Sequence, residues 1–246
     1  MNRVAVVVPA HDEQDLIGEC LAALSGAPEI IVVADACRDD TAARAAAAGA
    51  TVVEGSFRNV GQARAAGVAH ALRHGPAGLW IACTDADTRV PAHWLDWQLS
   101  HAGADVLVGT VEVDDWSRWP AGFPALYEAR YRLKVTGTAH GHVHGANLGF
   151  SAHAYLAAGG FPPVPVAEDR AFVSRARAAG ARVVTDPSCP VRTSSRAVGR
   201  APAGFAAHLS GLAAALQPGP PAAALQAGPP AAALQAGPPA AALHAG

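Results

Sequence analysis

The stretch Gly78-Leu79-Trp80-Ile81-Ala82-Cys83-Thr84-Asp85-Ala86-Asp87 places two carboxylates directly after a short apolar run. A continuous apolar run of this length, followed by polar residues, predicts a strand that is buried in a parallel sheet. Asp85 and Asp87 then lie at the carboxyl end of that strand, two positions apart. Carboxylates so placed can hold a divalent cation, which in turn can bind a diphosphate. The stretch therefore predicts an α/β sheet with a metal and phosphate site at one edge.

Strand-like and helix-like segments alternate before this stretch. Short apolar runs predict strands at 4–8, 30–33, 51–53 and 79–83. Helical spacing of apolar residues, alanine-rich composition and flanking glycines predict helices at 13–24, 42–48 and 61–74. Strands joined by helices form right-handed crossovers, so we expect a Rossmann-like α/β domain with a central, mostly parallel sheet flanked by helices.

The pattern is less regular after residue 100. The expected segments are a strand at 104–113, an aromatic and partly helical stretch at 116–135 that Pro120 and Pro124 break, a glycine-rich stretch at 140–150, helices at 154–159 and 169–179, and a strand at 182–184. We therefore expect one folded domain over 1–210, with a first half (1–100) that carries the phosphate site and a second half (101–210) built onto it.

The last residues, 211–246, repeat a nine-residue unit of Ala, Pro and Gly with one leucine, as in 221–229. Glycine does not recur at every third position, which excludes a collagen helix. Units so short and small-sided cannot form a core. We expect a disordered, low-complexity tail without chemistry of its own.

Composition narrows the class of protein. The chain has 246 residues, 51% of them apolar and 15% charged, with a net charge of −2, which favours a globular protein and argues against nucleic-acid binding. The four cysteines form no C-x-x-C pair, so reduced thiols and a cytoplasmic location are expected. We expect neither a secretory signal nor a transmembrane segment, while peripheral membrane contact stays open.

Common nucleotide and hydrolase motifs are missing. The turn after the first strand, Pro9-Ala10-His11-Asp12-Glu13, contains no glycine, so the dinucleotide fingerprint is absent. The sequence also has no Walker A loop, no H-E-x-x-H and no G-x-S-x-G. The expected phosphate site therefore belongs to another class.

Six motifs follow one another along the chain: V-V-V-P-A-H-D-E at 6–13, V-V-A-D-A-C-R-D-D-T at 32–41, N-V-G-Q-A-R at 59–64, D-A-D at 85–87, H-G-A-N at 144–147 and E-D at 168–169. This series resembles the inverting, family 2 glycosyltransferases with the GT-A fold. The resemblance implies transfer of one sugar from a nucleoside diphosphate sugar to a hydroxyl group of a small molecule, lipid or glycan, with inversion. The Q-x-x-R-W signature of processive synthases is absent, which favours single transfer.

The resemblance assigns the nucleotide to the first two motifs. It implies that Pro9 and Ala10 line the base and ribose, that Glu13 binds the ribose, and that Asp35 accepts the ring N–H of a pyrimidine. A carboxylate acceptor favours uracil over cytosine, hence a UDP-linked donor. Ala34 departs from the family, which has another acid at that position. Acids such as Glu13 can also stabilise a helix N-terminus.

The third and fourth motifs complete the donor site. Asn59, Gly61 and Arg64 are implied to approach the nucleotide, with Arg64 near Asp35 or the diphosphate, or else on the helix surface. For the fourth motif, 85–87, the resemblance implies that Asp85 and Ala86 lie at the ribose and that Asp87 coordinates Mn²⁺ or Mg²⁺. Both ions prefer oxygen ligands.

The fifth motif is implied to hold donor or acceptor sugar hydroxyls through His144, Gly145, Ala146 and Asn147. His140, His142 and His144 alternate along the chain and would share one face of an extended segment. Two interpretations stay open, a metal site and a polar wall of the cleft.

The E-D pair implies the catalytic acids, Glu168 and Asp169, with Asp169 as the general base. Both could instead stabilise the N-terminus of the helix that follows. No histidine stands after the last strand until His208, so Arg192 and Arg196 are candidates to bind the diphosphate directly.

Two other functions stay open. One is a retaining GT-A transferase for an anionic acceptor such as phosphoglycerate, which an arginine cluster over 192–200 would bind. The other is a degenerate domain that binds nucleotide or a partner without turnover, which Ala34 and the missing histidine motivate.

Overall fold

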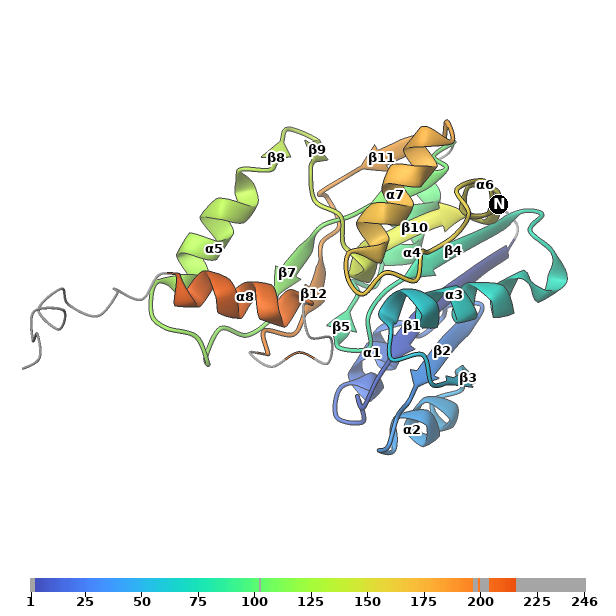
Figure 1. Ribbon diagram of the computed structural model, residues 1–246, viewed down its shortest axis with the longest axis horizontal. Coiled ribbons are helices and arrows are strands. Elements are labelled where there is room, and N and C mark those ends of the chain that lie inside the picture. The colour runs from blue at the N-terminus through green and yellow to red at the C-terminus, as the bar shows by residue number, and fades with distance from the viewer. Residues whose placement is uncertain (1–2, 102, 197–198, 200–203, 216–246) are drawn as a thin grey trace, which may run out of the picture.

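The computed structural model describes residues 3–101, 103–196, 199 and 204–215 (Figure 1). Its central sheet contains β1 (Arg3–Ala10), β2 (Ile30–Asp35), β3 (Thr51–Gly55), β4 (Leu79–Cys83), β6 (Val106–Val108), β10 (Leu148–Ser151) and β11 (Val183–Thr185). These strands lie in the order β11-β6-β10-β4-β1-β2-β3. Strand β10 runs antiparallel to both neighbours, and the other pairs are parallel, which confirms the mostly parallel sheet.

Helices cover both faces of this sheet: α1 (Ile17–Ala23), α2 (Thr41–Ala47), α3 (Val60–Ala71), α4 (Trp94–Ser100), α6 (Ala152–Ala157) and α7 (Glu168–Ala178). Side chains alternate along β1, so Ala5 and Val7 pack with α3, α6 and α7, while Val6 and Val8 pack with α1, α2 and α4. All four are fully buried. A strand buried on both faces reads as a continuous apolar run, which is why the sequence predicted it.

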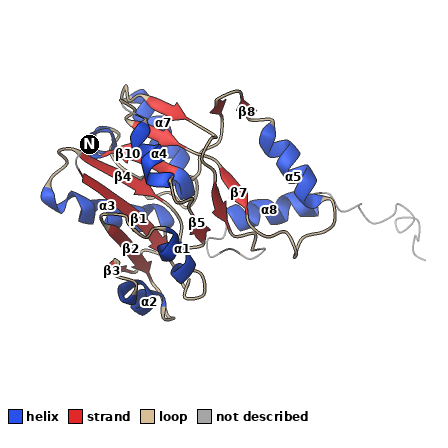
Figure 2. Cartoon of the chain, turned by 180° about the vertical axis from the view of Figure 1, so that it is seen from behind, coloured by secondary structure: helices blue, strands red, loops and turns tan. Residues whose placement is uncertain are grey.

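The second half adds smaller elements at one end of the molecule (Figures 1 and 2). They are the pair β8 (Val135–Thr136) and β9 (Ala139–His140), the helices α5 (Phe123–Arg132) and α8 (Phe205–Ala214), and the strands β7 (Val111–Val113) and β12 (Val191–Thr193), which form a three-stranded sheet with β5 (Thr88–Arg89) of the first half. The 3₁₀ turn η2 (Gly145–Asn147) precedes β10, and η1 (Leu72–His74), in the first half, follows α3. Phe123, Tyr127 and Leu209 form an apolar cluster that joins α5 to α8.

The single strand expected at 104–113 is wrong. The segment forms β6 in the central sheet and β7 in the smaller sheet, with Gly109 and Thr110 between them. A Cβ at Gly109 would lie 2.2 Å from the side chain of Asn147, and the Gly109 N–H donates to the Asn147 carbonyl at 2.9 Å. The chain therefore leaves the sheet where it passes against Asn147.

Two other expectations need correction. Pro124 does not break the helix but lies in the first turn of α5, where a missing N–H removes no helical hydrogen bond. The glycine-rich segment at 140–150 contains β10, which lies inside the central sheet between β4 and β6. A Cβ at Gly149 would lie 2.2 Å from Gln98 Oε1, so this strand admits no side chain there.

Helix α8 continues to Ala214, past the domain boundary expected at 210. The rest of the repeat, from residue 216 on, lies outside the described residues. Among the described helices, none is both long enough and apolar enough to cross a membrane.

Candidate active site

The carboxyl ends of β1 and β2 and the loop after β4 open onto a cleft of about 1070 Å³, which α5, α7 and α8 also border. Most of the residues singled out in the sequence line it: Pro9, Ala10, Glu13, Asp35, Asn59, Arg64, Asp85, Ala86, Asp87, His144, Gly145, Ala146, Glu168, Asp169 and Arg196. Residues from opposite ends of the domain meet here because the carboxyl ends of parallel strands share one edge of the sheet.

Asn147 and Arg192 do not line this cleft. Asn147 is fully buried, and its side chain accepts a hydrogen bond from Trp94 Nε1 at 2.8 Å and donates to two backbone carbonyls. Arg192 points from the other side of β12 into a separate, smaller cavity, where its Nε lies 3.9 Å from Glu112 Oε2. Neither side chain therefore lines the main cleft, where the sequence predicted both.

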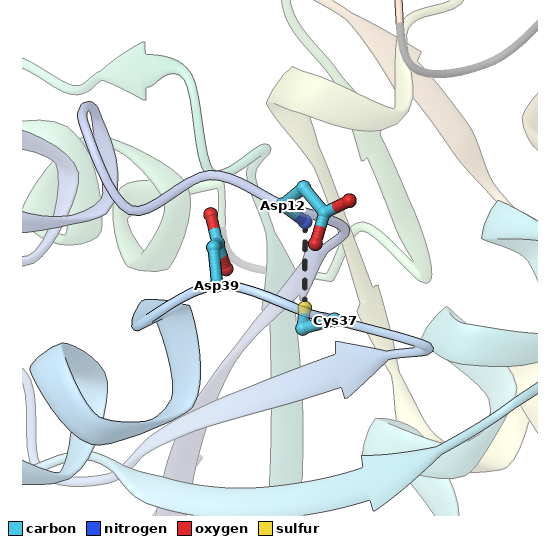
Figure 3. Close-up of side chains that lie close together, drawn as sticks. All are labelled: Asp12, Cys37 and Asp39. Atoms are coloured by element: carbon cyan, nitrogen blue, oxygen red, sulfur yellow. Dashed lines mark hydrogen bonds between the residues drawn. The ribbon is translucent and has the colours of Figure 1, made fainter.

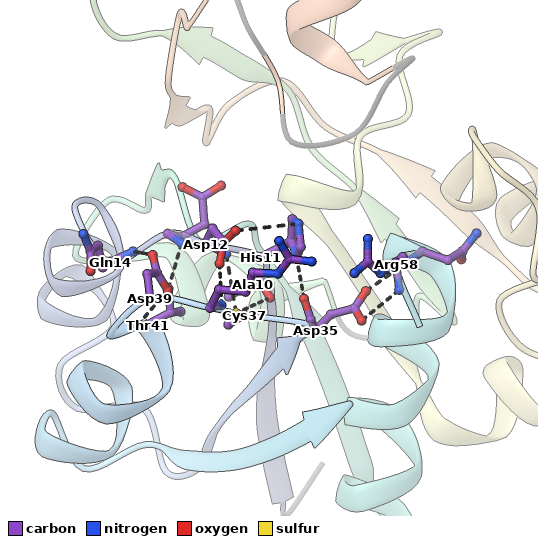
Figure 4. A network of polar contacts seen from close by, with 12 residues as sticks. Ala10, His11, Asp12, Gln14, Asp35, Cys37, Asp39, Thr41 and Arg58 are labelled. Atoms are coloured by element: carbon purple, nitrogen blue, oxygen red, sulfur yellow. Dashed lines mark hydrogen bonds and ion pairs between the residues drawn. The ribbon is translucent and has the colours of Figure 1, made fainter. Parts of the chain in front are cut away.

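The carboxylate of Asp35, at the end of β2, is oriented by the backbone before α3 (Figure 4). It accepts the N–H groups of Arg58 at 2.9 Å and Asn59 at 3.1 Å. Asn59 in turn caps α3 by accepting the Gln62 N–H at 2.9 Å. Each Asp35 oxygen keeps a second lone pair for a ligand.

The loops after β1 and β2 are joined by Asp12, Cys37 and Asp39 (Figure 3). These three residues are the one group of potential metal ligands that lie close together in the described part of the chain. Their polar atoms are hydrogen-bonded to the protein: the Asp12 N–H donates to Cys37 Sγ, and Asp39 accepts from Gln14 and Thr41. They lie outside the cleft lining, and Asp39 accepts the N–H of Thr41 at the start of α2, so we interpret the group as structural.

Arg64 is a buried arginine that lines the cleft and pairs with two carboxylates. Its guanidinium contacts Asp85 at 2.5 Å and also the carboxylate of Glu168. This partner set differs from the expected pairing with Asp35 or a diphosphate. Two glycines make room for it: a Cβ at Gly145 would lie 2.4 Å from Arg64 Cζ, and one at Gly61 would lie 2.9 Å from Glu168 Cβ. Gly61 therefore approaches Glu168 and does not line the cleft.

Burial and charge shift the pKa values of this pair in a consistent way. Burial raises the pKa of Glu168, and Arg64 opposes that rise. Burial would lower the pKa of Arg64, but the carboxylates of Asp85 and Glu168 raise it instead. The pair is therefore a buried ion pair in which Glu168 is held by Arg64.

The guanidinium of Arg196 contacts two acidic side chains that line the cleft, Glu13 and Asp87. It donates to Glu13 at 2.6 and 3.0 Å and also contacts Asp87. Glu13, expected at the ribose, is therefore occupied by an arginine. Burial raises the pKa of Asp87, and the charge of Arg196 opposes that rise. A positive group thus stands where the sequence predicted a metal ion.

Asp169 faces the cleft from the first turn of α7. Its Oδ2 accepts the Gly145 N–H at 2.9 Å and its Oδ1 accepts the Arg170 N–H at 2.7 Å. Ala167, the residue directly before α7, has a left-handed backbone (φ 59°), a strained conformation for a residue with a side chain. The turn therefore fixes Asp169 beside η2, half-buried and open to a ligand.

Two of the three alternating histidines, His142 and His144, have stacked rings and line the cleft, while His140 is tilted against His142 outside the lining. Tyr131 and His142 stack at 3.7 Å, and the Tyr131 hydroxyl lies 3.0 Å from His144 Nε2. Burial lowers the pKa of His144 to about 3, so it is a neutral acceptor for that hydroxyl. His140 and His142 bond to backbone carbonyls. This supports the cleft-wall interpretation over a metal site.

The structure adds residues to the cleft that the motifs did not indicate: Tyr127, Arg130, Tyr131, Lys134, Arg170 and His208. Spacing could have found Tyr127, Arg130 and Tyr131, because residues three or four positions apart share one face of a helix. That helix was not predicted from the sequence, because Pro120 and Pro124 were expected to break the segment.

Solved structures show the same fold. The S. aureus TarS fragment 1–349 aligns with a TM-score of 0.59 and 16% identity over 78% of this chain and 60% of its own. The mannosyltransferase PcManGT from Pyrobaculum calidifontis, in complex with GDP-Man and Mn²⁺, aligns with a TM-score of 0.61 and 23% identity over 80% of this chain and 58% of its own. The chain thus spans less than two thirds of either protein.

A third structure, glucosyl-3-phosphoglycerate synthase from Mycobacterium tuberculosis with Mn²⁺, UDP and glucosyl-3-phosphoglycerate, aligns with a TM-score of 0.51 and 18% identity over 78% of this chain and 70% of its own. No curated protein matches the sequence significantly. The model of the family described as "Glycosyl transferase family 2" matches residues 5–155. Because that match covers more than half of the sequence, the chain belongs to glycosyl transferase family 2 and has the GT-A type fold expected from its motifs.

Proposed function

We propose that this protein transfers a single sugar from a UDP-linked donor to a hydroxyl group of an acceptor, with inversion at the anomeric carbon. The observation that carries the proposal is the convergence of Asp35, Asp87 and Asp169, from three separate segments, on one cleft. Membership of glycosyl transferase family 2 supports it. A cleft of about 1070 Å³ also suits a ligand the size of a nucleotide sugar.

The nucleotide lies, in this proposal, at the carboxyl ends of β1 and β2 beside Pro9, Ala10 and Asp35. The free lone pairs of Asp35 accept the ring N–H of uracil. Cytosine lacks a hydrogen at that ring nitrogen and guanine has one, so guanine is the competing base. A comparison of nucleotides therefore tests the donor assignment directly.

A divalent cation, Mn²⁺ or Mg²⁺, belongs to the proposal, with Asp87 as its ligand. The site fits a cation because Asp87 and Glu13 already share one positive group, the Arg196 guanidinium. Carboxylate oxygens are also the ligands that both ions prefer. When bound, the ion would neutralise charge on the leaving diphosphate. Arg196, with its forked donors, can then bind the same diphosphate.

In this proposal, Asp169 is the general base that accepts the proton of the acceptor hydroxyl. The acceptor hydroxyl oxygen bonds to the anomeric carbon while the bond from that carbon to the diphosphate oxygen breaks. The diphosphate leaves with the electron pair, and the hydroxyl proton passes to the Asp169 carboxylate. Attack from the face opposite the leaving group inverts the anomeric centre. Glu168 is paired with Arg64, so it positions the site and does not take the proton.

The retaining alternative predicted an arginine cluster over 192–200 that binds an anionic acceptor; in the described part of that range, Arg196 lines the cleft and Arg192 does not. The anomer of the product, read by NMR, separates inversion from retention. Hydrolysis of the donor in the presence of Mn²⁺ separates an enzyme from a domain that only binds.

Thermal unfolding with UDP, GDP, CDP or ADP, each with and without Mn²⁺, tests the donor site. The largest increase in Tm is expected for UDP with Mn²⁺, because a ligand that binds the folded state stabilises it by mass action. Asp87→Ala should remove the part of the shift that depends on Mn²⁺. An unchanged shift in this variant would show that Asp87 is not the metal ligand.

Asp169→Asn tests the base. UDP binding should persist, while kcat should fall by about 10²- to 10⁴-fold, the typical contribution of general base catalysis. Asp96→Asn is the matched control, since Asp96 is an exposed acid of α4 outside the cleft. The base assignment fails if Asp169→Asn keeps most of its kcat.

A further inference from the structure

Three cationic side chains line the cleft on the side of α5 and α7. Arg130 lies in α5, and Lys134 lies two residues after the end of that helix. Arg170 lies in the first turn of α7. Within the described residues, none of the three has an acidic group within 4.0 Å. Arg64 and Arg196, by contrast, each contact two carboxylates.

The three charges act on one region. Burial lowers the pKa of His208, and the charges of Arg170, Lys134 and Arg130 lower it further. The same Arg170 also lowers the pKa of the half-buried His144, after desolvation and His142. Like charges gathered without acidic partners repel one another, and a bound anion would relieve that repulsion.

The donor does not account for this group of cations. Its diphosphate is expected beside Asp87 and Arg196, on the wall formed by the loop after β4 and the segment after β12. Arg170 instead follows Asp169, the proposed base, directly in the chain. An anion bound by Arg170 would therefore belong to the molecule whose hydroxyl faces Asp169.

We propose that the acceptor carries a phosphate group, which Arg130, Lys134 and Arg170 bind while the acceptor hydroxyl faces Asp169. The inference rests on the proposed function, because that function defines the acceptor. A phosphate dianion suits three cations, and arginine binds phosphate oxygens with two donors at once.

The phosphate can belong to a soluble molecule or to a lipid. Leu133, between Arg130 and Lys134 in the chain, is 83% exposed and lines the same cleft, as does the exposed Val166. An apolar surface beside the cations would suit a lipid chain. The test therefore has a soluble arm, glycerol 3-phosphate, and a lipid arm, phosphatidylcholine vesicles with phosphatidic acid.

Calorimetric titration of the full chain, saturated with UDP and Mn²⁺, measures the soluble arm, with glycerol as the uncharged reference. Sedimentation with vesicles, with and without phosphatidic acid, measures the lipid arm. Arg170→Gln and Lys134→Gln should each weaken binding of the phosphate probe about tenfold, the effect of losing one charge-assisted hydrogen bond. Arg170→Lys should restore part of the loss.

Arg132→Gln is the matched control. Arg132 lies on the same helix, pairs with Glu128 at 2.9 Å, has a 76% exposed side chain and does not line the cleft. This variant should bind the phosphate probe as the wild type does. Thermal unfolding of each variant confirms that it is folded.

The inference is overturned if glycerol 3-phosphate binds no better than glycerol and phosphatidic acid adds nothing to vesicle binding. It is also overturned if Arg170→Gln behaves like Arg132→Gln. A separate UDP titration keeps the two proposals apart. If UDP does not bind but the phosphate probe still binds through Arg170, the anion site stands, and the transferase proposal fails together with the acceptor role.

Discussion

The guanidinium of Arg196 lies where the motifs placed a divalent cation. The sequence predicted Asp87 as the ligand of a metal ion and Arg196 as a cation that binds the diphosphate, but it did not show that the two side chains contact each other. An arginine side chain is long and flexible, so its partner depends on distances between loops that only the folded chain sets. The same reason explains why Arg64 pairs with Asp85 and Glu168 and not with Asp35.

Removal of this guanidinium gives the first prediction. Arg196→Gln leaves Glu13 and Asp87 without their shared cation, so the free energy of unfolding should fall by about 1–3 kcal/mol without metal. Mn²⁺ should recover most of that loss and should bind more tightly than to the wild type, because Arg196 no longer competes for Asp87. Urea denaturation with and without Mn²⁺ measures both effects. Equal Mn²⁺ affinity in the two proteins would contradict the competition.

His144 gives a prediction about pH. Its pKa is about 3 in the folded protein because of burial, against 6.5 for the free side chain. Between these values the unfolded chain binds more protons, so stability falls as the pH falls below 6.5. His144→Gln keeps an acceptor for Tyr131 and should lose about 2 kcal/mol less than the wild type between about pH 7 and about pH 5.

Urea denaturation at the two pH values measures this difference. His153→Gln, at an exposed histidine of α6, is the control and should follow the wild type. The assignment fails if the His144 variant loses as much stability as the wild type does.

At the scale of elements, α3 and α7 meet at the site, and a glycine permits the contact. The sequence indicated a close approach at Gly61, and in the structure the neighbour that this glycine admits is Glu168. A glycine in a motif indicates that the backbone at that position passes close to another group. The motif does not identify that group, because the neighbour comes from a segment about a hundred residues away in the chain.

Gly61→Ala should be costly. The added Cβ would lie 2.9 Å from Glu168 Cβ and 3.0 Å from the Pro162 carbonyl oxygen. We expect the free energy of unfolding to fall by about 1–3 kcal/mol, as for overpacking in a core, and kcat to fall because Glu168 and Arg64 shift. Urea denaturation and the transfer assay measure the two effects.

Gly18→Ala is the control for this prediction. Gly18 is an exposed residue in the first turn of α1, and a Cβ there would meet no atom within 4 Å. Alanine should therefore stabilise the protein by about 0.5–1 kcal/mol, the usual helix preference for alanine over glycine. If both variants change stability equally, the contact between α3 and α7 does not explain the glycine.

At the scale of the whole molecule, α8 closes one side of the cleft, and the repeat begins within or after it. Leu209 is fully buried against Phe123 and Tyr127 of α5, and Leu212 packs on the same cluster. A chain ended after residue 210 should lose about 1–2 kcal/mol of unfolding free energy, because it loses the packing of Leu212. A chain ended after residue 215 should keep both its stability and its UDP binding.

Thermal unfolding of the two shortened chains, with and without UDP and Mn²⁺, tests this boundary. If the chain ended after residue 215 loses UDP binding, the repeat has a role in the site that the expectation of an inert tail denies.

The sequence by itself determined the class of fold and the acids of the site. Strands such as 4–8 and 79–83 are buried on both faces, so their apolar character is continuous and visible without a structure. Acids that directly follow such a strand must lie at the carboxyl edge of the sheet, which is why Asp85 and Asp87 were found from the chain alone, whereas Asp35 came from the resemblance of its motif. Asp169 came from the resemblance of its E-D motif.

The tertiary structure alone decided how those acids are paired and what the acceptor side contains. The antiparallel β10, the division of 104–113 between two sheets and the helix α5 depend on long-range packing, which local patterns do not record. The ion pairs of Arg64 and Arg196 follow from that packing, as do the positions of Arg130, Lys134 and Arg170, which have no acidic partner within 4.0 Å in the part of the chain that the structure describes. Charges interact through space, so their partners are set by the folded geometry and not by their order in the chain.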